Sequence, residues 1–404
     1  MWPLLFSLTF AGSVIWLLCR VLRQNRLYET LKSDGASADF DFPTVAVIVP
    51  ARNEALNIAT CLDSLLDQSY PRGKIEIIAI DDNSTDGTAA IIRERATREN
   101  GIKLLPAGAL PAGWAGKPHA CWIGALAADA EWLCFVDADT EAGPELLRSA
   151  VRACRERGYD LLSLSPFQQL THFLDRLVIP LGFLAIAASM DHARANRSPA
   201  EISVNGQFIL IRAERYFAAG GHSSARDQIC EDTALARSMR SLGLCVGLLG
   251  SETLMRTRMY RTAGELWEGF AKNVSQTFGG PARTSIVAIL SLVLGWSTPL
   301  VPVWAVADAI QRPHALEIAA ASIALSMAAV VMSIQIALAR HFRIPPWYAL
   351  LFPLGCSIGA LLAIDGVLRT ARGRVHWKGR VYPARSRAGR MEISQSTRPR
   401  SHDL

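Results

Sequence analysis

Long apolar segments near both ends of the chain restrict its fold more than any other feature. The first runs from Met1 to Cys19 without a charged residue and is followed by Arg20, Arg23 and Arg26. About 20 apolar residues suffice for a helix to span a bilayer. Because the positive charges follow the apolar run, we predict an uncleaved transmembrane anchor at residues 1–22 and not a signal peptide. The positive-inside rule then places the following chain in the cytoplasm.

Three further apolar segments form a predicted membrane region at 285–368, and each is long enough to span a bilayer: Ser285–Ile310, Ala315–Ala339 and Trp347–Leu368. The tail that follows, 369–404, carries ten Lys/Arg and two Asp/Glu, a net charge of +8. Three crossings would place this tail outside the cell, against the positive-inside tendency. We therefore expect a cytoplasmic tail and one segment that is re-entrant or interfacial. Ser285–Ile310 is the candidate, because Gly295, Pro299 and Pro302 favour irregular backbone.

The composition supports a membrane protein. Half of the residues are apolar and 19% are charged, whereas soluble domains carry about a quarter of charged residues. The net charge is +6, less than that of the tail alone, so the rest of the chain is slightly acidic. A membrane is therefore the predicted partner, and nucleic acid is not. The eight cysteines form no CxxC pair, which indicates dispersed thiols in a reducing compartment.

The middle of the chain, residues 43–283, alternates short β-rich runs with helical stretches. This alternation predicts an α/β domain with a largely parallel sheet. The expected strands are 45–49, 75–80 and 132–136, and the expected helices are 57–66, 88–98 and 120–128. A weaker apolar stretch, Leu177–Met190, contains Pro180 and Gly182. It is too short to cross a bilayer, so we expect a core or interfacial helix there.

Polar loops follow the three expected strands, at the edge where an α/β sheet binds its ligands. The first contains Arg52 and Glu54, and a helix N-cap at Asn53 explains it equally well. The second, DDNSTD at 81–86, holds three carboxylates that repel one another unless hydrogen-bond donors compensate them. A nucleobase imide and sugar hydroxyls are donors of this kind. The second loop therefore favours a nucleotide-sugar ligand over a simple turn.

The third loop places Asp137 and Asp139 after the strand at 132–136. In extended backbone, residues i and i+2 point the same way, so we predict that the two carboxylates project together. Their mutual repulsion is removed by a hard divalent cation, Mg²⁺ or Mn²⁺, which takes its remaining oxygens from water and a diphosphate. The pattern therefore predicts a metal and diphosphate site.

Taken together, these motifs resemble the family 2 glycosyltransferases with the GT-A fold. The runs VIVPARNE, IDDNSTDGT and FVDADT and a later Glu231-Asp232 follow the family's order and spacing across residues 43–271. Segments 113–120, 256–273 and 377–380 resemble membrane-bound enzymes associated with hopanoid biosynthesis, and bacterial carotenoid glycosyltransferases share similar features. The resemblance implies an α/β, Rossmann-like GT-A domain with a mostly parallel sheet, flanked by transmembrane helices.

The resemblance also implies which residues bind the donor. Pro50, Arg52 and Glu54 would line the nucleotide pocket, and Asp82 would contact the uracil ring of a UDP-sugar. Lys117 would lie near the diphosphate, where a flexible positive charge is useful. A solvated loop lysine is the other interpretation of Lys117.

The metal and the catalytic acids are implied in the same way. Asp139 would bind the metal, and Asp137 the metal or the ribose. Glu231-Asp232 matches the acidic pair of inverting members, in which Asp232 would be the general base and Glu231 would orient it or the acceptor. Two acids at a helix N-terminus are the alternative explanation of this pair. Arg261 would bind diphosphate oxygens.

Two nearby features remain open. Polymer-making members carry a Q-x-x-R-W pattern, whereas this chain has Arg258-Met259-Tyr260-Arg261, which favours transfer of a single sugar. Arg256 and its neighbours would otherwise meet anionic lipid headgroups. His222 would assist the acceptor or the metal, or it is a turn histidine.

The sequence thus predicts a glycosyltransferase of the bacterial inner membrane with a cytoplasmic catalytic domain. It would move one hexose from a nucleotide sugar to a lipid hydroxyl, with a hopanoid as the candidate acceptor, by a metal-dependent inverting mechanism. Transfer to a polyprenyl phosphate and an inactive membrane scaffold are the alternatives. No G-x-G-x-x-G follows the strand at 45–49, which disfavours a nicotinamide oxidoreductase.

Overall fold

A mixed, mostly parallel sheet forms the centre of the α/β domain. The computed structural model describes residues 2–33, 40–98, 101–190, 202–228, 230–372, 374–377 and 380–383, so residues 384–404 of the predicted tail lie outside it. The order of the seven strands is β3 (Ile102–Pro106), β2 (Ile75–Asp81), β1 (Val45–Ala51), β4 (Trp132–Val136), β8 (Phe208–Arg212), β6 (Leu161–Ser165) and β9 (Val246–Gly250). Only β8 runs antiparallel to its neighbours among these described strands.

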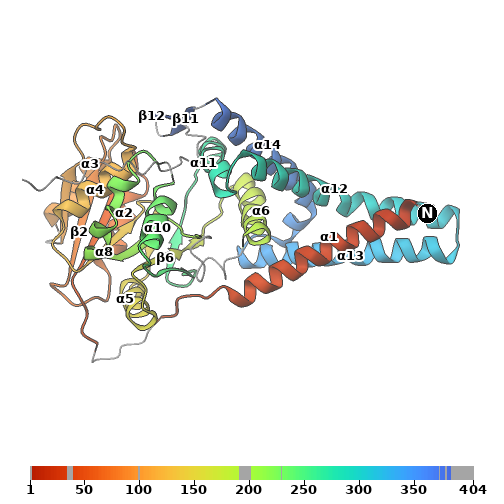
Figure 1. Ribbon diagram of the computed structural model, residues 1–404, viewed down its shortest axis with the longest axis horizontal. Coiled ribbons are helices and arrows are strands. Elements are labelled where there is room, and N and C mark those ends of the chain that lie inside the picture. The colour runs from red at the N-terminus through yellow and green to blue at the C-terminus, as the bar shows by residue number, and fades with distance from the viewer. Residues whose placement is uncertain are drawn as a thin grey trace, which may run out of the picture.

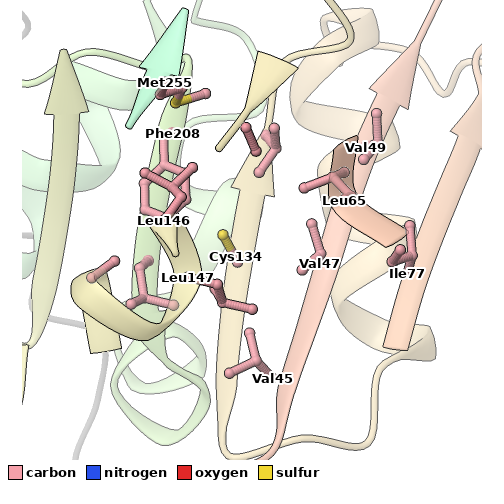
Figure 2. Close-up of a cluster of buried hydrophobic side chains, with 14 of the residues drawn as sticks. Val45, Val47, Val49, Leu65, Ile77, Cys134, Leu146, Leu147, Phe208 and Met255 are labelled. Carbon is pink, nitrogen blue, oxygen red and sulfur yellow. The ribbon is translucent and has the colours of Figure 1, made fainter. Parts of the chain in front are cut away.

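Helices cover both faces of this sheet. In β1, Val45, Val47 and Val49 point to one face and Ala46 and Ile48 to the other, and all five are buried. Such a continuous apolar run is typical of a strand in a parallel sheet covered on both sides. Figure 2 shows the first face, where the valines pack with Leu65 and Leu146.

The two faces receive different helices. The first packs against α2 (Ile58–Leu66), α3 (Thr88–Arg98) and α5 (Leu146–Arg157), and the second against α4 (Gly116–Ala127), α8 (Ala213–Ala218) and α10 (Glu231–Ser241). The expected helix 88–98 and strand 132–136 are confirmed to the residue. The other expected elements are present with ends shifted by a few residues.

Smaller elements complete the domain. A three-stranded sheet contains β5 (Thr140–Ala142), β10 (Met255–Thr257) and β7 (Phe167–Gln168). The short helix α9 (Gly221–Ser224) precedes α10, and α11 (Ala263–Thr277) leads toward the apolar region. The apolar stretch expected to be a core or interfacial helix forms α6 (Phe173–Ser189), with Pro180 inside it.

Four described helices are long and apolar enough to cross a membrane: α1 (Trp2–Leu27), α12 (Pro281–Gln311), α13 (Ala315–His341), and a 3-10 turn η1 (Pro346–Leu351) that continues into α14 (Phe352–Ala371). Figure 1 shows α1, α12 and α13 running side by side away from the α/β domain. The N-terminus and the turn between α12 and α13 lie together at the far tip.

The expectation of irregular backbone in Ser285–Ile310 is wrong. These residues lie in α12, one continuous helix that contains Pro299 and Pro302 in its interior. A proline removes one helical hydrogen bond, and in an apolar segment packed by neighbouring helices this loss does not break the helix. Gly295 permits a close approach instead, because a Cβ there would lie 2.8 Å from the Cβ of Cys356 in α14.

Helix α14 takes a different path from the other three. It starts beside the middle of α12, where Cys356 meets Gly295, and runs back along α12 so that Ala360 and Ala363 pack on Ala288. Near its end, Gly366 lies against α11. The chain then forms a hairpin of β11 (Arg374–Trp377) and β12 (Arg380–Pro383), and β11 packs against α11 and α14. Helix α14 therefore returns toward the α/β domain (Figure 1).

Candidate active site

The predicted site residues follow strands that end at one edge of the central sheet. Strands β1, β2 and β4 are parallel neighbours, with Ala51 beside Asp81 and Ile48 beside Phe135. Their carboxyl ends therefore meet, as ligand sites of α/β sheets require. The antiparallel β8 begins at the same edge, where the carbonyl of Gln207 accepts a hydrogen bond from the amide of Asp137.

The first loop is bonded to the second loop through Arg52. Arg52 Nη1 donates to the carbonyl oxygens of Asp82 and Asn83, at 2.7 and 3.1 Å. Arg52 thus fixes the second loop through its backbone. Pro50 lies within β1, opposite Ile80 of β2.

Two predicted donor-binding residues, Glu54 and Arg261, meet through Asn57. The Asn57 amide nitrogen donates to Glu54 Oε2 at 2.8 Å, and its oxygen accepts from Arg261 Nη2 at 2.6 Å. Arg261 Nη2 also donates to the carbonyl of Leu56. Residues about 200 positions apart are therefore joined at the edge of the sheet. Asn57 was not among the predicted site residues, because it serves equally well as the residue before α2.

Asp82 makes a contact that was not expected. Both of its carboxylate oxygens accept hydrogen bonds from the guanidinium of Arg380 in β12, at 2.5 and 2.9 Å. The side chain of Asp82 is 6% exposed and that of Arg380 17%. Gly116, the first residue of α4, makes room for this pair, since a Cβ there would lie 2.1 Å from Arg380 Nη1.

The loop after β4 corrects one part of the prediction. Asp137–Thr140 is a turn, in which the amide and hydroxyl of Thr140 both donate to the carbonyl of Asp137. The extended geometry that was to project Asp137 and Asp139 together is therefore absent from this described loop. The backbone leaves the sheet at Val136 and turns to start β5. Both carboxylates still lie near the buried Cys61, whose pKa is raised by burial and then by these two charges and Glu54.

Lys117 joins the third loop to the acidic pair. Its Nζ lies 2.7 Å from Asp137 Oδ1 and 2.9 Å from Glu231 Oε1. Burial acts to lower the pKa of Lys117, but the attraction of the two carboxylates outweighs it and raises the pKa well above the ordinary value. The ammonium is therefore charged across the physiological range. Lys117 is thus a member of the acidic cluster and not a solvated loop lysine.

The two acids at the start of α10 differ in their electrostatics. Burial acts to raise the pKa of Glu231, yet its ion pair with Lys117 holds that pKa below the ordinary value. Burial, with repulsion by Glu231, raises the pKa of Asp232 to about 6. Both acids occupy the first turn of a helix, where negative charge is favourable. Environments that push neighbouring carboxylates apart in pKa are typical of catalytic acids and bases.

Three other titratable or charged residues of the domain differ in their surroundings. His222 is buried, with its Nδ1 2.9 Å from the hydroxyl of Tyr216, and burial lowers its pKa to about 4. It is a neutral histidine buried in the short helix α9 and not a turn residue. Burial lowers the pKa of Lys272 in α11, although the nearby charge of Glu231 acts to raise it. The exposed Arg256 pairs with the half-buried Glu141 on the small sheet.

Lys272 and Arg380 were not predicted to be site residues, although both belong to segments that carried the family resemblance. The sequence provided no reason to assign them a role, because neither residue lies in a loop that follows one of the three expected strands. Among the described residues, no three His, Cys, Asp or Glu side chains converge as a group able to hold a metal alone.

Comparisons with known proteins bear on this arrangement. Residues 46–173 match the model of glycosyl transferase family 2. A 4,4'-diaponeurosporenoate glycosyltransferase of Staphylococcus aureus is 29% identical over 287 residues, which cover 69% of this chain and 72% of that protein. A mannosyltransferase of Pyrobaculum calidifontis, solved with GDP-Man and Mn²⁺, superposes with a TM-score of 0.53 at 18% identity, covering 91% of this chain and 99% of that one. The predicted α/β fold of GT-A type is thereby confirmed.

Proposed function

We propose that this chain is a glycosyltransferase whose catalytic domain includes residues 46–173, which match the family 2 model, and that it moves one sugar from a nucleotide-sugar donor to the hydroxyl of an apolar lipid at a membrane. The observation that carries the proposal is the cluster of Lys117, Asp137 and Glu231 beside Asp232 at the ligand-binding edge of the sheet. It combines a fixed positive charge with a carboxylate of raised pKa. An inverting glycosyl transfer needs both, one for the leaving diphosphate and one for the attacking hydroxyl.

Asp232 is the proposed general base. With a pKa of about 6, it is mostly ionised at neutral pH and still basic enough to accept a proton as the acceptor oxygen attacks the anomeric carbon. The bond between that carbon and the diphosphate oxygen breaks, and its electron pair leaves with the nucleoside diphosphate. Glu231 is held by Lys117 and keeps its charge, so it orients the site instead of taking up the proton.

The choice of a hydroxyl acceptor follows from this base. A carboxylic acid is already ionised near pH 7 and needs no base to become a nucleophile, whereas an alcohol does. The relative from Staphylococcus aureus has a name that specifies a carotenoid acid, and it supports an apolar acceptor for this chain. The hopanoid acceptor remains a proposal that rests on the resemblance of segments 113–120, 256–273 and 377–380.

A divalent metal, Mg²⁺ or Mn²⁺, fits the donor set. Asp137 and Asp139 supply hard oxygen ligands, and such ions complete their coordination with water and diphosphate oxygens, so two protein carboxylates suffice. When bound, the metal would neutralise the charge that develops on the diphosphate. Lys117 supplies positive charge at Asp137, and Arg261 lies at the first loop through Asn57. We propose that both cations orient the donor phosphates.

The apolar helices support a location at the membrane. Four of the described helices meet the length and composition of a span, and α6 packs between them and the α/β domain (Figure 1). An apolar acceptor held in the bilayer would reach the site from this side. The arginines that follow the first apolar run favour a cytoplasmic α/β domain in the bacterial inner membrane, where nucleotide sugars are available.

The test is direct. Purified full-length protein in detergent is incubated with UDP- and GDP-sugars, Mn²⁺, and either a hopanoid alcohol, a carotenoid acid or a polyprenyl phosphate. Mass analysis of the lipid fraction should show one added hexose on the alcohol. Transfer only to the polyprenyl phosphate or only to the acid would refute the hydroxyl acceptor. Release of no sugar from any donor by folded protein would refute the enzyme assignment to nucleotide sugars.

A further inference from the structure

We infer that the hairpin β11–β12, which follows the last apolar helix, is part of the donor site, and that Arg380 is a positioning residue that holds Asp82 as the acceptor for the nucleobase N–H. This inference rests on the proposed function, in which Asp82 contacts the base. Its basis is the two-fold contact between the Arg380 guanidinium and both oxygens of Asp82.

The contact is built into the fold from both sides. Asp82 follows β2 in the α/β domain, whereas Arg380 is 298 residues later, beyond α12, α13 and α14. The hairpin is anchored, since β11 packs against α11 and α14. Gly116 provides the space, because a Cβ there would lie 2.1 Å from Arg380 Nη1 and 2.5 Å from Asp82 Oδ2. Three segments that are distant in the sequence therefore meet at this ion pair: the loop with Asp82, the start of α4 at Gly116 and β12 with Arg380.

The geometry favours positioning over blockage of the base site. A carboxylate offers about four lone-pair sites, and a guanidinium that approaches end-on occupies two of them. The remaining pair still accepts an N–H from a ligand. A carboxylate that is 6% exposed also needs a counter-charge, because an uncompensated buried charge is costly. Without Arg380, the carboxylate of Asp82 would lose the two hydrogen bonds that orient it.

A buried histidine beside the Asp82–Arg380 pair has a ring nitrogen, unpaired among the described residues, that a ligand could contact. His119 is 5% exposed, and its Nδ1 finds no hydrogen-bond partner among the residues that the structure describes. Burial lowers its pKa, and both Asp82 and Arg380 are close enough to act on it. A buried imidazole nitrogen of this kind requires an explanation, and a polar group of a bound nucleotide beside the Asp82–Arg380 pair supplies one.

The experiment measures nucleotide binding by calorimetry on the full-length protein in detergent with Mn²⁺. The ligands are UDP, GDP and inorganic pyrophosphate, and the variants are Arg380→Gln, Arg380→Lys and Gly116→Ala. Gly116→Ala pushes the pair apart without removing a charge. The matched control is Arg372→Gln, an exposed arginine at the end of α14. Thermal unfolding confirms that each variant is folded.

We expect wild type to bind the preferred nucleoside diphosphate more tightly than pyrophosphate. Arg380→Gln and Gly116→Ala should lose about tenfold of that preference, the size of one hydrogen bond to a charged group, with pyrophosphate affinity unchanged. Arg380→Lys should recover part of it, and Arg372→Gln should match wild type. With sugar transfer as the readout, donor KM should rise while kcat changes little.

Two results would overturn the inference. An Arg380→Gln protein with unchanged nucleotide preference would show that the contact is only structural. Tighter nucleotide binding by that variant would show that Arg380 competes with the base for Asp82. If wild type transfers sugar and either result is found, the proposed function stands and the inference fails. If folded wild type binds no nucleotide, the proposed function itself fails.

Discussion

The ammonium nitrogen of Lys117 lies 2.9 Å from Glu231 Oε1, and the same nitrogen lies 2.7 Å from Asp137 Oδ1. One positive charge thus links the loop after β4 to the start of α10. The two carboxylates would repel each other without it, and Asp232 would gain a second uncompensated neighbour. Lys117 is therefore the residue whose loss should disturb the whole acidic cluster.

Replacing Lys117 by Met should reduce sugar transfer about 10²-fold or more, since a preorganised charge near the leaving group is removed. Melting temperature should fall as well, because the buried Glu231 is left without its counter-charge. Lys103→Met, on the exposed side of β3, is the matched control. Wild-type transfer by Lys117→Met would exclude a role at the diphosphate.

The pH profile should report Asp232. A base must be ionised to accept a proton, so kcat should fall as the pH drops through about 6, the raised pKa of this carboxyl. Asp232→Asn should bind donor almost normally and transfer about 10²–10⁴-fold more slowly. The exposed Asp129→Asn serves as control. A carboxylate acceptor would be far less sensitive to Asp232→Asn, which separates the two acceptor classes.

A milder change at Gly206 provides an independent test of Asp232. A Cβ at this position would lie 3.1 Å from Asp232 Oδ2, so Gly206→Ala should displace the carboxylate by a few tenths of an ångström. We expect a several-fold loss of kcat with unchanged donor affinity. If kcat and the pH profile both stay at wild-type values, the position of Asp232 is not important for the reaction.

Metal dependence can be measured through binding as well as turnover. Removing divalent ions with a chelator should abolish transfer, and Mn²⁺ or Mg²⁺ should restore it. Asp139→Asn should weaken Mn²⁺ binding, which is measured by calorimetry in the presence of nucleoside diphosphate. The melting temperature of this variant should stay close to that of wild type. Full activity in chelator would contradict the assignment of Asp137 and Asp139.

Topology can be tested with one native and one introduced thiol. Cys245 is exposed on the α/β domain, and His314 lies in the turn between α12 and α13. In intact cells, a membrane-impermeant maleimide should label His314→Cys and spare Cys245; permeabilised cells should show labelling of both. Labelling of Cys245 in intact cells would contradict the cytoplasmic orientation.

The sequence predicted three of the seven described strands of the central sheet, because their apolar residues reflect burial on both faces. The run Trp132–Val136 is apolar at every position, as expected for a strand buried on both faces, and it was identified to the residue. The backbone after it was predicted wrongly. Whether Asp137–Thr140 stays extended depends on hydrogen bonds to the carbonyl of Asp137, and two acids separated by one residue carry no information about them.

Long-range contacts account for the features of the candidate site that the sequence did not predict. The pairs Lys117–Glu231 and Asp82–Arg380 join residues more than a hundred positions apart, and no local pattern encodes such a pairing. Helix α12 shows the opposite error: Gly295, Pro299 and Pro302 suggested a break, but α12 is one continuous helix with both prolines in its interior.

The Asp82–Arg380 contact also sets an order of events during synthesis. Asp82 emerges from the ribosome early, but Arg380 follows only after α12, α13 and α14 have been made. Both residues must end in the same compartment to touch, so in the proposed membrane topology the intervening chain would cross the bilayer an even number of times. A chain with a misinserted helix would present a folded α/β domain whose Asp82 lacks its arginine. At the proposed membrane location, the Asp82–Arg380 contact would therefore form only in a correctly inserted chain.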